Sequence, residues 1–245
     1  MKIYYFNLKR KRGRLILLLL ALVGLVLGNN YLKSSELTTL KKYQPIYQGN
    51  GEGKKIALIC NVVWGEEFIP EMLSLLRKKD VKITYFIGGQ WAEKFPELTE
   101  LIDKEGHEIG NHGYAHQRPS SLSEWDNWEE IRKTEEIIYK ITKKKTKLFH
   151  PPYRDQDNRV VEIAGEKGYI TIMSSVDTID WQRPDPQVIV ERVTLKIHNG
   201  AIVLMHPTAP TIRALPQIID KLKAQGYQIV TVSELLANPQ NTHNP

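Results

Sequence analysis

Two histidines stand four residues apart in the segment Asn-His-Gly-Tyr-Ala-His, at His112 and His116. Neutral imidazoles at this spacing can share a metal ion. A further histidine, His150, precedes the segment Pro-Pro-Tyr. A histidine pair of this kind is also common on ordinary protein surfaces. The pair becomes informative only if the fold brings other reactive side chains to the same place.

A second set of candidate residues contains acids and one histidine. Asp177 and Asp180 precede Trp181 in the segment Asp-Thr-Ile-Asp-Trp, and His206 follows an apolar run. A histidine oriented by a carboxylate can transfer a proton during catalysis. Taken alone, the two acids also suit a turn, and His206 also suits a core position.

Short apolar runs alternate with amphipathic stretches from Lys54 onward, which predicts a parallel sheet covered by helices. Seven strands at this spacing predict a single domain with a distorted, closed or nearly closed (β/α)7 barrel. The predicted strands are residues 56–60, 83–87, 108–110, 147–149, 170–174, 201–205 and 228–232. The predicted helices are residues 68–79, 96–104, 125–141, 159–167, 186–196 and 215–225, the third capped by Ser123.

The candidate residues share one position relative to these strands. His112 and His116, His150, the two acids and His206 each follow a predicted strand, and Asn61 follows the first. The carboxyl ends of barrel strands converge on one face, where active sites are built. We therefore expect one cleft with Asn61 at its floor, surrounded by His112, His116, Asp180, Trp181 and His206.

With these motifs in order, the sequence resembles the polysaccharide deacetylases of carbohydrate esterase family 4, also called the NodB-homology domain. The resemblance covers residues 54–236 and rests on NHGYAH, PPY, DTIDW and VLMHP. It implies a distorted β/α barrel that hydrolyses N-acetyl groups on chitin-like or peptidoglycan glycans. The segment Trp64-Gly65-Glu66-Glu67 resembles a branch associated with sporulation in the cell envelope.

The resemblance implies roles for the matching positions. His112 and His116 correspond to ligands of a divalent metal, zinc by preference, and His206 to the acid that protonates the leaving amine. Asp180 corresponds to the carboxylate that orients this acid. The pocket for the acetyl methyl group corresponds to Tyr153, Trp181 and Leu204, and the backbone N–H of Tyr153 to the oxyanion donor.

The first family motif is replaced in this chain. Where the family has two aspartates, a base and a third metal ligand, this chain has Asn61 and Val62. An amide is not a base near neutral pH, and valine cannot bind a metal. The family arginine that pairs with the base is replaced by His150, so the base and its partner are changed together.

Three interpretations follow. The chain is a deacetylase with a rebuilt site, in which His150 is the third ligand and Glu66, Glu67 or Asp155 is a substitute base. Alternatively, it is a degenerate glycan-binding or scaffold protein that keeps the pocket and needs no metal. The third interpretation is a metal-independent hydrolase of another small amide.

Charge and hydropathy at the start of the chain predict export. Six of the 34 Lys and Arg residues precede residue 15, which leaves 28 against 28 Asp and Glu in the remainder. A folded part without surplus positive charge argues against nucleic-acid binding. The basic run and the apolar residues 15–27 predict a signal peptide or short membrane anchor over residues 1–28, with the rest extracytoplasmic, anchored or secreted. We expect a linker over 29–53, the barrel over 54–238 and a polar tail over 239–245.

Overall fold

The computed structural model describes residues 19–29 and 43–237. The chain divides into two units, and the boundary along the sequence lies after Tyr43. Residues 19–29 are helical and their side chains are exposed. The basic run, most of the predicted linker and the predicted tail lie outside the described residues. Among the residues that are described, no helix combines the length and the apolar character needed to cross a membrane.

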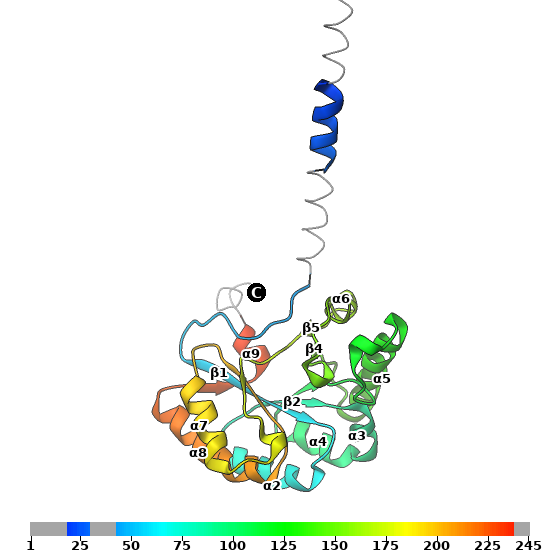
Figure 1. Cartoon of the computed structure of the whole chain (residues 1–245). Coiled ribbons are helices and arrows are strands. Elements are labelled where there is room, and N and C mark those ends of the chain that lie inside the picture. Colours follow the sequence, from blue (N-terminus) through cyan, green and yellow to red (C-terminus); the bar gives the residue numbers. More distant parts are fainter. Residues whose placement is uncertain (1–18, 30–42, 238–245) are drawn as a thin grey trace, which may run out of the picture. The chain divides into compact units, whose positions relative to one another are not determined.

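The larger unit is built on a curled, wholly parallel sheet (Figure 1). Its main path runs β5-β4-β3-β2-β1-β7-β6, and β8 pairs with the start of β1 on the edge opposite β7. The strands are β1 Lys55–Val62, β2 Thr84–Ile87, β3 Glu108–Asn111, β4 Leu148–Phe149, β5 Ile170–Thr171, β6 Val176–Asp177, β7 Ile202–Met205 and β8 Gln228–Val230. The predicted distorted barrel of a single α/β domain is therefore confirmed, as a half-barrel with seven strands on its main path.

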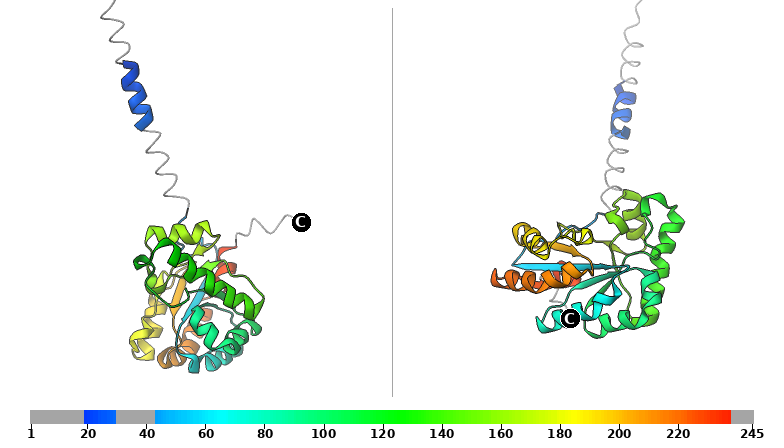
Figure 2. Two further views of the ribbon diagram at one scale, coloured as in Figure 1. Left: turned by 90° about the vertical axis from the view of Figure 1, so that its right-hand side faces the viewer. Right: turned by 60° about the horizontal axis from the view of Figure 1, so that its bottom comes forward.

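Helices surround this sheet, with α7 and α8 on one flank and α5 on the other (Figures 1 and 2). They are α2 Ile69–Lys78, α3 Gly89–Lys94, α4 Pro96–Lys104, α5 Glu124–Thr142, α6 Asn158–Glu166, α7 Pro186–Lys196, α8 Ala209–Ala224 and α9 Val232–Leu236. The predicted cap of α5 is present, because the Ser123 hydroxyl accepts the backbone N–H of Asp126 at 3.1 Å. Helix α8 begins six residues earlier than predicted, since Thr208 caps it and Pro210 fits its first turn.

The alternation of side chains along β1 separates the outer core from the barrel interior. Ile56, Leu58, Cys60 and Val62 pack against the helices, whereas Ala57 and Ile59 pack inside the barrel. Successive side chains of a strand point to opposite faces, so Asn61 continues the inner row and Val62 the outer one. This alternation places Asn61 in the functional pocket and Val62 in the core behind the sheet.

The compact unit starts at Gln44, ten residues before the predicted boundary at Lys54. Ile46 bridges Ile172, and its backbone exchanges hydrogen bonds with Thr171 and Met173 at 2.8 and 2.7 Å. Gln48 bridges Ala201 at the start of β7. The end of the predicted linker thus connects the β5 side of the sheet to the β7 side.

Candidate functional site

A pocket of about 480 Å³ opens at the carboxyl ends of the strands. It is lined by Asn61, Val63, Trp64, His112, His116, Arg118, Tyr153, Arg154, Asp177, Trp181, Leu204 and His206. Its volume lies in the range of small-ligand sites. The structure therefore brings together most of the predicted site residues, and Asp180 contacts the pocket through His206.

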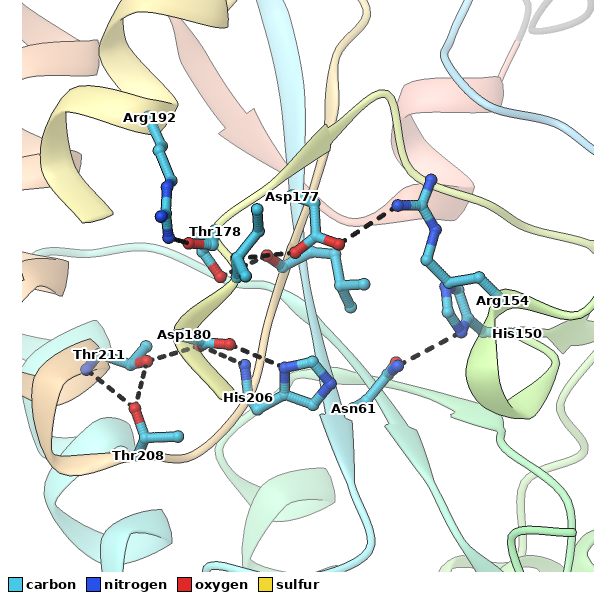
Figure 3. Close-up of polar contacts among 12 residues, drawn as sticks. Asn61, His150, Arg154, Asp177, Thr178, Asp180, Arg192, His206, Thr208 and Thr211 are labelled. Atoms are coloured by element: carbon cyan, nitrogen blue, oxygen red, sulfur yellow. Dashed lines mark hydrogen bonds and ion pairs between the residues drawn. The ribbon is translucent and has the colours of Figure 1, made fainter. Parts of the chain in front are cut away.

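His206 and Asp180 form a hydrogen-bonded pair at one side of the pocket (Figure 3). The Asp180 carboxylate is fully buried and accepts three hydrogen bonds. They come from His206 Nδ1 at 2.8 Å, the His206 backbone N–H at 2.6 Å and the Thr211 hydroxyl at 2.6 Å. The carboxylate accepts His206 Nδ1–H, which leaves Nε2 as the ring nitrogen free to exchange a proton. The indole of Trp64 stacks on this imidazole, with the two ring centroids 5.8 Å apart.

The loop that carries Trp64 depends on a glycine. Gly65 has φ 80°, and a Cβ on it would lie 2.3 Å from the Pro207 carbonyl oxygen. Only glycine combines this left-handed backbone with so close an approach. Gly65 thereby holds the Trp64 loop against the loop that carries His206.

His112 and His116 lie next to each other, with ring centroids 5.1 Å apart. Asn111 fixes their loop, because its side chain donates to Ile131 in α5 and accepts the Gly113 N–H. The His112 Nδ1–H donates to the His150 carbonyl oxygen, so Nε2 keeps its lone pair. Burial and the neighbouring histidines lower the pKa of His112 well below its ordinary value, and burial lowers that of His116.

His150 lies behind the pocket wall and pairs with Asn61. Its Nδ1 is 3.4 Å from the Asn61 amide nitrogen, as Figure 3 shows. Burial, followed by the charge of Arg154, lowers its pKa to about 3, so the ring is neutral. His150 is fully buried and is not among the pocket-lining residues.

The metal-binding capacity of the site is incomplete. Of the three imidazoles that line the pocket, His206 is held by Asp180, which leaves His112 and His116 as candidate ligands, and Asn61 adds only a neutral amide. Over residues 19–29 and 43–237, no three His, Cys, Asp or Glu side chains are grouped so that they could hold a metal ion. These donors do not fit the three-ligand set of a catalytic zinc.

The acids considered as a substitute base lie elsewhere. Glu66 and Glu67 belong to the short 3-10 helix Glu66–Phe68, and Asp155 accepts the Ser120 backbone N–H at 2.8 Å. None of the three lines the pocket. Asp177 does line it, but its carboxylate binds Arg154 at 3.2 Å and the Ile179 N–H at 2.8 Å (Figure 3).

Aromatic side chains form the pocket rim. Tyr153 and Trp181 are more than half exposed, and Leu204 lies beneath them in the barrel interior. Tyr153 holds a left-handed φ of 58°, a conformation that costs energy in a non-glycine residue. Large apolar bodies that stay exposed around a pocket are typical of ligand recognition.

The sequence alone did not single out Arg118, Val63 or Thr211 as functional residues. Thr211 stands three residues after the cap Thr208, and its hydroxyl accepts the Thr208 hydroxyl and donates to Asp180. The segment Thr-Ala-Pro-Thr is a signal that could have revealed this position. No local pattern marks Arg118, because only folding brings it to Tyr153.

The parallel half-barrel, the two facing histidines and the His206–Asp180 pair define the class of protein to which this chain belongs. The profile of the polysaccharide deacetylase family matches residues 48–172. The chain is a member of that family, whose enzymes are generally metal-dependent, and it is deacetylase-like.

Two relatives illustrate the range of similarity. The Bacillus subtilis protein YlxY is 45% identical over 193 residues, which are 79% of this chain and 60% of that protein. A peptidoglycan-N-acetylglucosamine deacetylase of Bacillus cereus is 32% identical over 201 residues, covering 80% of this chain and 73% of the enzyme.

A solved structure adds a more specific similarity. BA3943 from Bacillus anthracis, described as a CE4 family pseudoenzyme, is 43% identical and superposes with a TM-score of 0.78, over 79% of this chain and 69% of that one. A mutant of BA3943 described as having restored enzymatic activity is 42% identical with the same TM-score, over 79% of this chain and 71% of the other.

Proposed function

We propose that this chain binds N-acetylated cell-wall glycan in the retained pocket and does not hydrolyse it at rates ordinary for the family. The observation that carries the proposal is the Asn61–His150 pair, which occupies the place of the catalytic base and its partner. An amide is not a base, and His150, whose pKa burial lowers to about 3, is too weakly basic and lies outside the pocket lining, so neither residue activates water.

No free carboxylate in the pocket replaces the missing base. Asp177 is the one carboxylate among the lining residues, and Arg154 and the Ile179 N–H occupy both of its oxygens. A metal ion would meet two imidazoles and an amide without an anionic ligand. Both observations argue against efficient activation of water.

The features that recognise a glycan are retained. Sugar rings have apolar faces that can stack on exposed aromatic rings, and Tyr153, Trp181 and Trp64 offer such rings around the pocket. Asn61 Oδ1 is buried at the pocket wall without a hydrogen-bond partner in the described part of the chain. An acetamido N–H is a donor that would satisfy this oxygen, so the change from acid to amide turns a base into a binding group.

The relatives favour a glycan of the peptidoglycan type over a chitin-like one. Two Bacillus cereus proteins 32% and 37% identical to this chain are named peptidoglycan-N-acetylglucosamine deacetylases. Since the chain spans 60% of YlxY, the proposal concerns the pocket and not every activity of a longer protein.

The proposed function also requires the barrel to lie outside the cytoplasm, where cell-wall glycan is found. The basic run and apolar residues 15–27 would export the barrel and contact the membrane as a signal or anchor, with residues 29–43 as the linker before the compact unit. A role in sporulation is part of this proposal. Fractionation of cells into cytoplasm, membrane and medium tests the location.

A slow deacetylase is the second candidate, because the His206–Asp180 pair is intact. A donor for the leaving amine is needed only if the amide bond is cleaved. In this alternative a weakly held divalent metal, zinc by preference, would supply Lewis-acid chemistry between His112 and His116.

The deciding experiment measures binding and turnover on the same full-length preparation. We expect the chain to bind peptidoglycan fragments, to contain much less than one zinc per chain and to release no acetate above background. Trp181→Ala should weaken binding, whereas Trp125→Ala, an exposed tryptophan outside the pocket, should not. Absence of glycan binding, or turnover ordinary for enzymes, would contradict the proposal.

A further inference from the structure

Arg118 is a prearranged cation at the rim of the pocket. Its guanidinium lies over the Tyr153 ring, 4.7 Å from the ring centre, and the other neighbour of that ring is His116 at 4.7 Å. The backbone beside Arg118 is held by a short turn, because its carbonyl accepts the Ser121 N–H and hydroxyl. Stacking on an aromatic ring orients a guanidinium and leaves its edge donors free.

Arg118 is not part of any ion pair formed within residues 19–29 and 43–237. The positive charge of Arg118 is one of the influences that lower the pKa of Asp155, and the Asp155 carboxylate already accepts the Ser120 N–H. The guanidinium therefore faces the pocket rim with donors to spare.

The other charged side chains at the pocket are held in pairs of opposite type. Arg154 is neutralised by Asp177, and it also donates to the Ser174 carbonyl at 3.0 Å. His206 is paired with the Asp180 carboxylate, so this pair adds no net positive charge in either protonation state.

We propose that the pocket selects glycans whose sugars carry a carboxylate, and that Arg118 is the residue that recognises this group. A planar guanidinium donates two parallel charge-assisted hydrogen bonds to a carboxylate, an acceptor that a neutral sugar lacks. The inference rests on the proposed glycan binding and adds the charge of the ligand. The expected ligand is an acidic N-acetylated amino sugar, with its acetamido group toward Asn61 and its carboxylate toward the rim.

The test compares two ligands that differ only in charge. One is a peptidoglycan tetrasaccharide without peptides, whose lactyl carboxylates are free. The other is the same tetrasaccharide with those carboxylates converted to methyl amides. Calorimetry on the full-length chain at low salt should give a Kd about 10-fold lower for the acidic form, the usual scale of a charged hydrogen bond.

Two variants assign the preference to Arg118. Arg118→Gln should bring the two dissociation constants together by weakening only the acidic ligand. Arg77→Gln removes an equal charge from an exposed position on α2 outside the pocket and should keep the preference. Equal affinities in the unmodified chain, or a preference that survives in Arg118→Gln, would overturn this inference while leaving glycan binding intact. If neither tetrasaccharide binds the unmodified chain, the proposed function itself fails.

Discussion

Asn61 Nδ2, in the pocket lining, lies 3.4 Å from Nδ1 of His150, which is fully buried behind the pocket wall. The resemblance to the family puts a carboxylate and an arginine at these two positions. A charged pair has become a neutral one, and each replacement suits only the other. A single reversion would bury an uncompensated charge, which explains why the two changes belong together.

Restoration is the first prediction. Asn61→Asp with Val62→Asp and His150→Arg should give acetate release at least about 10²-fold above the parent, because a positioned base contributes at that scale. Acetate release from peptidoglycan oligosaccharides, with and without a chelator, measures the gain. The mutant of BA3943 with restored activity is a precedent in a protein 42% identical to this chain.

The same series needs a folding control, because Val62 faces the outer core. We expect Val62→Asp alone to lower the Tm, since it buries a carboxylate among apolar side chains. If the parent already holds zinc tightly and turns over at ordinary rates, the degenerate interpretation is wrong. His150→Ala then becomes the test for a replacement ligand.

The second prediction concerns His206. In the restored variant, His206→Ala should abolish acetate release, because the leaving amine still needs a proton. In the parent the same change should leave the Kd for glycan within about threefold, since binding depends on the rim and on Asn61. Parallel calorimetry and acetate assays separate the two roles, and a large loss of binding in the parent would contradict this division.

The third prediction is that Asp180 stabilises the fold. Asp180→Ala should lower the free energy of unfolding by about 3 kcal/mol, because it leaves the His206 N–H and the Thr211 hydroxyl buried without an acceptor. Denaturation in urea measures the change. Asp220→Ala removes an exposed partner of Lys79 and should cost less than about 1 kcal/mol. Equal losses in the two variants would be evidence against a buried network.

The fourth prediction sets the start of the folded unit. A chain that begins at residue 44 should fold, whereas one that begins at residue 54 should be less stable by about 2 kcal/mol, since it loses the Ile46 and Gly49 hydrogen bonds and the burial of Ile46. Thermal unfolding of both chains gives the comparison. Equal stability would support the original linker boundary at Lys54.

The fifth prediction is acid sensitivity caused by His107, away from the pocket. Burial, with the charge of Lys82, lowers the pKa of His107 to about 4, and Nδ1 accepts the Ile83 N–H. The unfolded chain takes up this proton below about pH 6.5, so stability is complete above that pH and falls as the pH drops toward 4. Between pH 7 and pH 5 the unmodified chain should lose about 2 kcal/mol more than His107→Gln. Urea denaturation at both pH values measures this difference, and identical losses would contradict it.

The architecture was predictable from sequence because long periodic segments decide their own structure. The apolar runs and amphipathic stretches predicted β1 to β5, β7 and β8 and six helices, with Ser123 capping the longest. Two-residue β6 and short α3 and α9 were not predicted. Segments this brief carry too few residues for a period, and their hydrogen-bond partners come from distant parts of the chain.

The site was decided at both levels. By itself the sequence determined which residues follow the strands, and so brought His112, His116 and His206 to one end of the sheet. Only the tertiary structure decided which side chains face the pocket. In the folded chain Val62 packs in the outer core and His150 is buried behind the pocket wall. Arg118 lies over the ring of Tyr153. The physical reason is that strand order depends on a local periodic pattern, whereas the direction of a side chain depends on packing partners far away in the sequence.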